Sequence, residues 1–127
     1  MGNLKSLLMF GFVLIAVGAK AQPGPDTTLN IIEKSKIKYH LEDGKNKLYT
    51  GDFRAALKTF REVLQADPNN VLAKYRIADC YYGLKRFKLS KKYIDKVDRI
   101  GLKKRMLKDY VFLKGKIYHR NAEFDEA

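Results

Sequence analysis

The 127-residue chain has a single cysteine, three prolines and no tryptophan. One thiol has no partner for an internal disulfide, so the chain is not a disulfide-stapled domain and must be held together by packing. The thiol, Cys80, stands between Ala78 and Tyr81 in an apolar stretch. We predict that it is a small buried hydrophobic residue and not a reactive nucleophile.

The sequence also lacks the residue patterns that catalysis requires. Its two histidines, His40 and His119, lie far apart, and neither has a second ligand at a metal-binding spacing. His40 shares a potential helix face with Asp43, but a solvated polar pair is the simpler interpretation. There is no glycine-rich phosphate loop and no Gly-x-Ser-x-Gly motif. We therefore predict no enzymatic activity, no cofactor and no metal site.

The amino terminus has the order of a secretory signal peptide. Lys5 precedes an apolar run over residues 7–18, and Ala19-Lys20-Ala21 supplies small residues at the positions that a signal peptidase reads. The alternative is an uncleaved membrane anchor, but a spanning helix needs about 20 apolar residues and the run is shorter. No cysteine near the cut is available for a lipid anchor. We predict a cleaved signal peptide over 1–21.

Cleavage places the protein in the periplasm or at the outer membrane. Residues 22–28, with two prolines and a glycine, are predicted to be a flexible lead-in. The signal contains two lysines and no acid, so the net charge falls from +12 to +10. The remaining chain over 29–127 is long enough for one small domain.

A repeat of 34 residues runs through this domain. The first copy contains Phe53, Ala56, Phe60 and Val63, and the second has Phe87, Ser90, Ile94 and Val97 at the same positions. A third copy follows at a spacing of 37, where Ala78, Tyr81 and Phe87 recur as Gly115, Tyr118 and Phe124. Such a period is typical of stacked helical repeats.

The chain resembles the tetratricopeptide repeat family. Ile77-Ala78 and Tyr81 match the large-small-x-x-aromatic signature of a first helix, and Asp67-Pro68-Asn69-Asn70 matches the link that closes a repeat. Pro68 cannot continue a helix, while Asn69 or Asn70 can cap the next one. The resemblance implies an all-α solenoid of about two and a half helix–turn–helix repeats over residues 29–127, with the third repeat truncated.

Periodicity and breakers place the individual helices. They are expected at about 29–49, 53–66, 71–84, 87–99 and 103–120, and a further helix of the third repeat is expected to begin at Phe124. Gly101 is the predicted end of the fourth helix. Ala56, Ala78 and Ser90 are predicted to lie where the two helices of a repeat cross closely.

The resemblance also implies where a partner binds. First helices of this family line the concave surface, which here would carry Lys45 from repeat one and, from repeats two and three, Tyr75, Asp79, Tyr82, Phe112, Lys116 and His119. Rigid aromatic side chains make good contact anchors. The alternative for Tyr75 and Tyr82 is that they pack over neighbouring helices.

A strongly basic stretch follows over residues 85–108. It holds eleven cations against Asp95 and Asp98: Lys85, Arg86, Lys88, Lys91, Lys92, Lys96, Arg99, Lys103, Lys104, Arg105 and Lys108. Such a patch attracts anions, and export argues against nucleic acid as the partner. Acidic proteins, anionic lipid head groups, envelope polysaccharide and a merely solvated face remain open.

The sequence therefore predicts a non-catalytic, exported scaffold that binds a protein or peptide. The alternative is a structural role, as the N-terminal repeat region of an OmpA-like, peptidoglycan-associated outer-membrane protein. That alternative is an analogy, since no OmpA-like residue is present in the chain.

Overall fold

The computed structural model describes residues 26–125. The predicted signal peptide over 1–21 and residues 22–25 of the lead-in lie outside the described residues. Residues 34–125 belong to one compact unit, and residues 26–33, the first turns of the first described helix, belong to another. Between residues 26 and 125, no helix combines the length and apolar character needed to cross a membrane.

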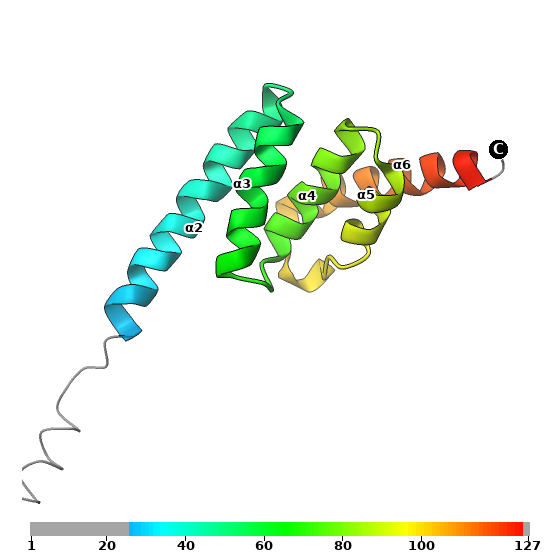
Figure 1. Cartoon of the computed structure of the whole chain (residues 1–127). Coiled ribbons are helices and arrows are strands. Elements are labelled where there is room, and N and C mark those ends of the chain that lie inside the picture. The colour runs from blue at the N-terminus through cyan, green and yellow to red at the C-terminus, as the bar shows by residue number, and fades with distance from the viewer. Residues whose placement is uncertain (1–25, 126–127) are drawn as a thin grey trace, which may run out of the picture. The chain divides into compact units, whose positions relative to one another are not determined.

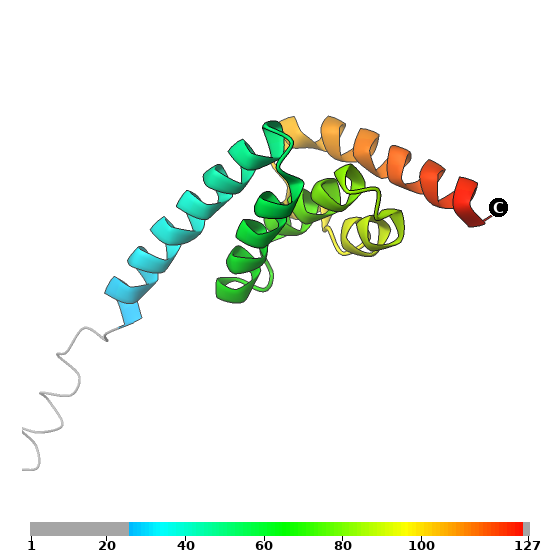
Figure 2. The ribbon, with the colours of Figure 1, turned by 45° about the horizontal axis from the view of Figure 1, so that its top comes forward.

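The described chain is entirely helical, as predicted. Five α-helices follow one another: α2 (Asp26–Tyr49), α3 (Phe53–Ala66), α4 (Val71–Gly83), α5 (Phe87–Ile94) and α6 (Leu107–Asp125). Two short 3₁₀ helices, η1 (Arg99–Gly101) and η2 (Lys104–Met106), lie between α5 and α6. Neighbouring helices α3, α4 and α5 lie side by side and alternate in direction (Figures 1 and 2). α2 begins three residues before the predicted start, and no proline or glycine stands there to delay it.

The turns inside the first two repeats are built alike, 34 residues apart. After α2, the N–H of Gly51 donates to the carbonyl of Leu48 at 3.1 Å and the N–H of Asp52 donates to that of Lys47 at 2.9 Å. After α4, Lys85 and Arg86 make the same pair of bonds at 3.0 and 2.8 Å. This is the Schellman motif, whose key residue is left-handed, and φ is 82° at Gly51 and 57° at Lys85.

Side-chain caps close the link between the repeats. The Asn70 side chain accepts a hydrogen bond at 3.0 Å from the N–H of Ala73, so the capping predicted for this link is confirmed. Asp52 caps α3 in the same way, accepting from Ala55 at 3.1 Å. Each cap satisfies a backbone donor that the first helical turn leaves unpaired.

Two hydrophobic clusters fill the core, and α4 contributes to both. One cluster joins α2, α3 and α4 around Phe60 and Ile77. The other joins α4 to α5, the following connector and α6 around Ile94 and Ile117. The small residues at the helix crossings are fully buried as predicted, and the Ser90 hydroxyl donates to the Ala78 carbonyl at 2.6 Å.

The two repeats use different residue pairs at the same crossing. Repeat two has Ala78 and Ile94 at the equivalent positions, both in one core cluster, whereas repeat one has Gly44 against the larger Phe60. A Cβ on Gly44 would stand 2.7 Å from Phe60 Cε1, which is closer than carbon atoms pack. The phenyl ring of Phe60 therefore fits at this crossing because residue 44 has no side chain.

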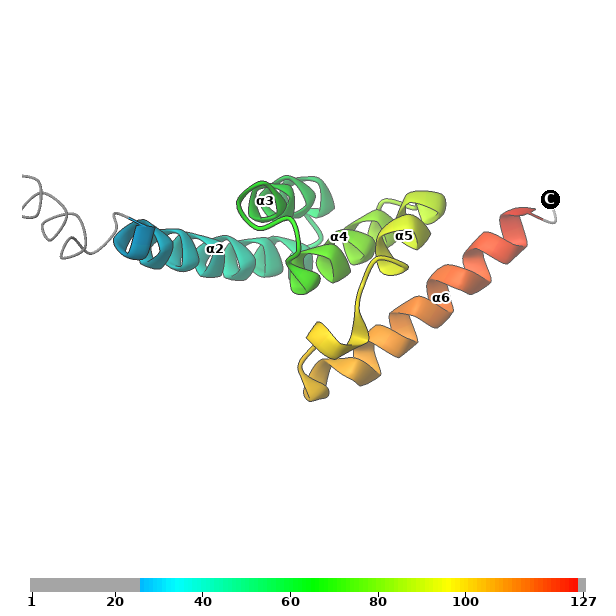
Figure 3. The same ribbon diagram turned by 90° about the horizontal axis from the view of Figure 1, so that it is seen from below.

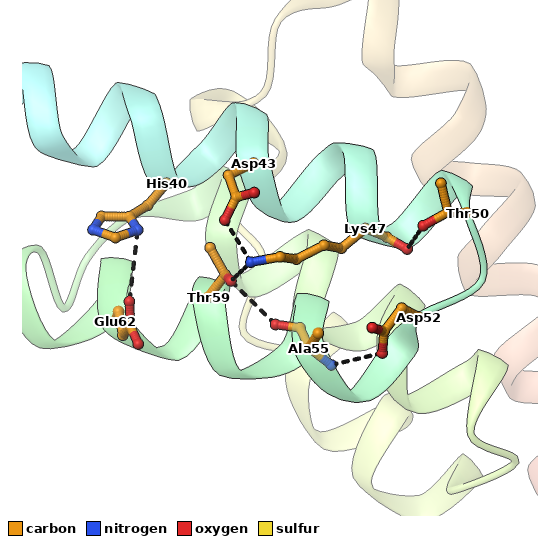
Figure 4. Close-up of polar contacts among 8 residues, drawn as sticks. All are labelled: His40, Asp43, Lys47, Thr50, Asp52, Ala55, Thr59 and Glu62. Carbon is orange, nitrogen blue, oxygen red and sulfur yellow. Dashed lines mark hydrogen bonds and ion pairs between the residues drawn. The ribbon is translucent and has the colours of Figure 1, made fainter.

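A polar network joins α2 to α3 in repeat one (Figure 4). Lys47 Nζ donates to Asp43 Oδ2 at 2.6 Å and to Thr59 Oγ1 at 3.1 Å. The hydrogen bond to Asp43 raises the pKa of Lys47. Beside it, His40 Nδ1 lies 3.6 Å from Glu62 Oε2, so His40 faces α3 instead of Asp43. In repeat two the positions of Lys47 and Thr59 hold Tyr81 and Tyr93, whose rings lie 5.5 Å apart.

Helix α5 is shorter than predicted, and Gly101 does not cap it. The helix ends at Ile94, and the chain continues as a connector through η1 and η2 (Figure 3). Gly101 lies within η1, where a Cβ would stand 2.6 Å from Val71 Cγ2. The glycine is required by this close approach to α4, which periodicity along α5 does not reveal.

Helix α6 is longer than predicted and does not break before Phe124. It runs without interruption through Asp125, so the expected turn into a further helix is absent from the described residues. Repeat two turns at Gly83 and the left-handed Lys85, and the equivalent residues of repeat three are Arg120 and Ala122. Both favour a continuing helix. In addition, the buried Asn121 side chain donates to the Phe87 carbonyl at 2.9 Å, which ties this turn of α6 to α5.

Candidate partner-binding surface

The first helices of successive repeats line one open cleft of about 360 Å³. Its apolar walls come from Leu41 and Tyr49 of α2, Leu72 of α4 and Met106 of η2. Charged side chains complete the lining: Glu42, Lys45, Arg76, Arg105 and Asp109. The cleft thus combines apolar surface with three cations and two acids, contributed by α2, α4, η2 and the start of α6.

Arg76 stands at the centre of this lining and is held by its surroundings. Its guanidinium carbon lies 5.9 Å from the ring centroid of Tyr49 and 5.3 Å from that of Tyr75. Its Nη1 lies 4.0 Å from Asp79 Oδ2. Two aromatic rings and a carboxylate neighbour restrict the position of the Arg76 guanidinium. Arg76 is therefore a pre-oriented cation in the cleft.

The cleft continues into a cluster formed by Asp79 and Tyr82 of α4 and Phe112 and Lys116 of α6. Lys116 Nζ lies 4.9 Å from the ring centroid of Tyr82 and 4.8 Å from that of Phe112. Burial raises the pKa of Asp79, and the nearby charges of Arg76 and Lys116 oppose this rise. Asp79 therefore lies near a cation of the cleft, Arg76, and near a cation of the cluster, Lys116.

Helix periodicity explains why these residues share a surface. Positions 72, 76 and 79 form a stripe on α4, and positions 105, 109, 112, 116 and 119 form a stripe that begins in η2 and follows α6. Phe112 is 68% exposed, so a large aromatic ring faces water at the middle of the second stripe. Exposed aromatic side chains of this kind are common anchors at protein interfaces.

Not every predicted groove residue is available to a partner. Asp79, Tyr82, Phe112 and Lys116 come together as described. Tyr75 is 4% exposed and packs beside Tyr110 with 6.3 Å between ring centroids, so the packing interpretation holds for it. Burial raises its pKa to about 12.

Tyr82 is only partly accessible to a partner, whereas His119 is exposed but engaged by a neighbouring carboxylate. Tyr82 is half-buried and packs edge-on against Phe87 at 5.4 Å, while its ring also meets Lys116. His119 is exposed, and its Nε2 lies 3.2 Å from Glu123 Oε1. The described residues hold no group of three His, Cys, Asp or Glu side chains placed to bind a metal ion.

Sequence reasoning missed most of the cleft itself. It named Lys45 but not Tyr49, Leu72, Arg76 or Met106. Extending the helical stripe backwards from Asp79 by three and seven residues would have found Arg76 and Leu72. No comparable signal existed for Met106, because it lies in a 3₁₀ turn that the repeat pattern does not predict.

The eleven basic residues are distributed over the α4–α5 turn, α5, the connector and the start of α6. All are exposed except the half-buried Lys91, whose Nζ lies 3.4 Å from Asp95 Oδ2. Arg105 also lines the cleft, so one member of the basic set belongs to the groove. Cys80 is fully buried, as predicted, and burial raises its pKa to about 12.

These features define a class of protein: a stack of helix–turn–helix repeats whose first helices line a cleft. Residues 47–106 match the family model described as tetratricopeptide repeat, so this segment of the chain is a tetratricopeptide-repeat segment. Comparison with curated proteins and with solved structures gives no match. Members of the family are generally non-catalytic and bind other proteins, and the repeat therefore implies a protein–protein interaction scaffold.

Proposed function

We propose that the chain binds a segment of a partner protein in the cleft and against the adjoining cluster of Asp79, Tyr82, Phe112 and Lys116. The observation that supports this most directly is the convergence of α2, α4 and the start of α6 on one cleft of about 360 Å³. Binding clefts are concave, mostly apolar and equipped with a few placed polar groups. This cleft is concave and has apolar walls, but charged side chains form five of its nine lining residues, so it suits a partner that carries charge as well as apolar groups.

The lining suggests the chemistry of the partner segment. Leu41, Leu72 and Met106 favour apolar side chains, and the oriented Arg76 together with Arg105 favours a carboxylate. The exposed ring of Phe112 adds an anchor farther along α6. The best-fitting partner is therefore an apolar segment that carries one or more acidic residues.

Site-specific photo-crosslinking in the native host tests this proposal. A benzophenone amino acid at position 112 is expected to give a discrete adduct, and the same probe at Val111 is the matched control. Val111 is 53% exposed and adjacent in sequence but points about 100° around the helix. Equal adducts from both positions would argue against a site on this face.

Binding of the captured protein then measures the contribution of each residue. Phe112→Ala is expected to weaken binding by about tenfold or more, as aromatic anchors do, whereas Val111→Ala leaves it unchanged. Arg76→Gln should weaken binding of an acidic segment and reduce its salt dependence. If Phe112→Ala bound normally, the cluster would not be part of the interface.

We also propose that the scaffold works in the cell envelope after export. The leader pattern over residues 1–21 supports this, and the test is N-terminal sequencing of protein from the periplasmic fraction, where the chain is expected to begin at Gln22. Full-length chain in the membrane fraction would support the anchor instead. The relation to OmpA-like outer-membrane proteins stays a prediction based on analogy.

A further inference from the structure

The connector between α5 and α6, residues 95–106, presents an isoleucine to water. Ile100 is 92% exposed, more than any other large hydrophobic side chain in the described part of the chain. It lies in η1, within the connector that runs from α5 to α6 (Figure 3). A single exposed aliphatic side chain is common on protein surfaces, and Ile100 is informative here because basic residues flank it on both sides.

The connector holds Ile100 outward by fixed contacts on both sides. Asp98 Oδ1 accepts a hydrogen bond from the N–H of Ile100 at 3.0 Å, which closes the turn. Leu102, two residues later, is buried in the core cluster of α4 and α6. Gly101 lies so close to Val71 that a Cβ would stand 2.6 Å from its Cγ2. Ile100 is thus the exposed tip of an anchored turn.

Basic residues flank Ile100 on both sides in the sequence. The connector carries five exposed ones: Lys96, Arg99, Lys103, Lys104 and Arg105. Its two acids are engaged within the fold, because Asp98 caps η1 and Asp95 accepts from Lys91 at 3.4 Å and from the Tyr118 hydroxyl. The connector therefore presents an apolar tip within a positive surface.

We infer that this connector docks the protein on an anionic lipid surface. A polyanion such as a nucleic acid or an acidic polysaccharide would attract the cations but would leave Ile100 in water. A bilayer with anionic head groups can bind both the basic residues and Ile100. The cations bind at the head groups, and the apolar side chain enters the boundary with the acyl chains. Lipid is therefore favoured over a purely charged partner.

Co-sedimentation with vesicles tests the inference on the full chain without its leader. Vesicles with one third phosphatidylglycerol in phosphatidylcholine are expected to bind it, and pure phosphatidylcholine vesicles are not. Ile100→Ser should weaken binding by about tenfold, from the lost burial of one aliphatic side chain. Neutralising Lys96, Arg99, Lys103 and Lys104 to glutamine should weaken it by about a hundredfold or more, since each charge contributes about fivefold near an anionic surface.

Matched variants elsewhere separate this site from general effects. Ile31→Ser removes another exposed isoleucine, and glutamine at Lys34, Lys36, Arg54 and Lys58 removes four exposed charges outside the connector. Both are expected to bind far better than their connector counterparts. If the two four-charge variants lost binding equally, net charge alone would explain the attraction and the inference would be overturned.

The missing tryptophan provides a second and independent readout. Since the chain contains none, Ile100→Trp introduces a unique fluorophore at the tip. Its emission is expected to shift to the blue with phosphatidylglycerol vesicles and to be quenched by brominated acyl chains, while heparin leaves the spectrum unchanged. A shift with heparin and none with vesicles would assign the surface to a polysaccharide. Circular dichroism first confirms that each variant is folded.

Discussion

Replacing Gly44 by alanine is expected to destabilise the protein although alanine is the better helix former. In an open helix this change increases the free energy of unfolding by about 1 kcal/mol. Here the new Cβ would stand 2.7 Å from Cε1 and 2.8 Å from Cζ of Phe60, a ring with no exposed surface to move into. Overpacking of a filled core costs about 1–3 kcal/mol, so after the helix-propensity gain the net loss is about 0–2 kcal/mol.

Gly115→Ala is the matched control. Gly115 is also a helical glycine, in α6, but apart from its chain neighbours and the backbone of its own helix nothing lies within 4 Å of the place where a Cβ would stand, so the helix propensity acts alone. This variant should gain about 1 kcal/mol, which separates the two substitutions by the overpacking cost of about 1–3 kcal/mol. Urea denaturation followed by circular dichroism measures both free energies. If the two variants were stabilised equally, the proposed contact between α2 and Phe60 would be refuted.

The residues of the second repeat suggest a double variant that should relieve the clash in the first. It has Ala78 and Ile94, both in one core cluster, at the positions where repeat one has Gly44 against Phe60. The double variant Gly44→Ala, Phe60→Ile should therefore be more stable than the sum of the two single changes predicts, with a coupling of about 1–2 kcal/mol. Simple additivity would contradict a direct clash.

Three further predictions follow from individual residues. Lys85→Gly should raise the free energy of unfolding by up to about 1 kcal/mol in urea denaturation, because a left-handed φ of 57° strains any residue with a Cβ; a loss of stability would refute the strain. Native Cys80 should not react with a disulfide reagent at mildly alkaline pH, because burial raises its pKa to about 12, and reaction should follow unfolding in urea. Burial raises the pKa of Asp79, so its contribution to stability is largest below the ordinary value of 3.8 and is lost as the pH rises through the folded value. Asp79→Asn should therefore increase the melting temperature at neutral pH and not in acid; an equal shift at both pH values would show that ionisation is not the cause.

The sequence predicted the features that the two repeats share. It predicted few of the features in which the chain departs from the repeat. The 34-residue period correctly identified the helix pairs, the buried small residues at their crossings and the Asn70 cap, since each follows from local chemistry at equivalent positions. The same register brought Asp79 and Tyr82 together with Phe112 and Lys116. These four residues needed only the helical period and the order of the repeats.

The errors arose where contacts between distant segments decide the outcome. Two interpretations were open for Tyr75, and its contact with Tyr110 of α6 favours packing over exposure in the groove. The end of α5 depends on how the connector reaches Val71, and the continuation of α6 depends partly on the bond from Asn121 to Phe87, 34 residues earlier. Sequence spacing does not contain these distances.

The sharing of α4 between the two core clusters has a consequence for the order in which the protein folds. Phe60 of α3 packs with Ile77 and Cys80 of α4 in one cluster, whereas Tyr75 and Ala78 of the same helix pack with Ile117 in the other. Either end can open without exposing both clusters, but loss of α4 exposes both at once. The amides of α4 should thus be the last to exchange with solvent, and the nucleus for folding should include this helix and one neighbour, with α2 or α6 added by propagation.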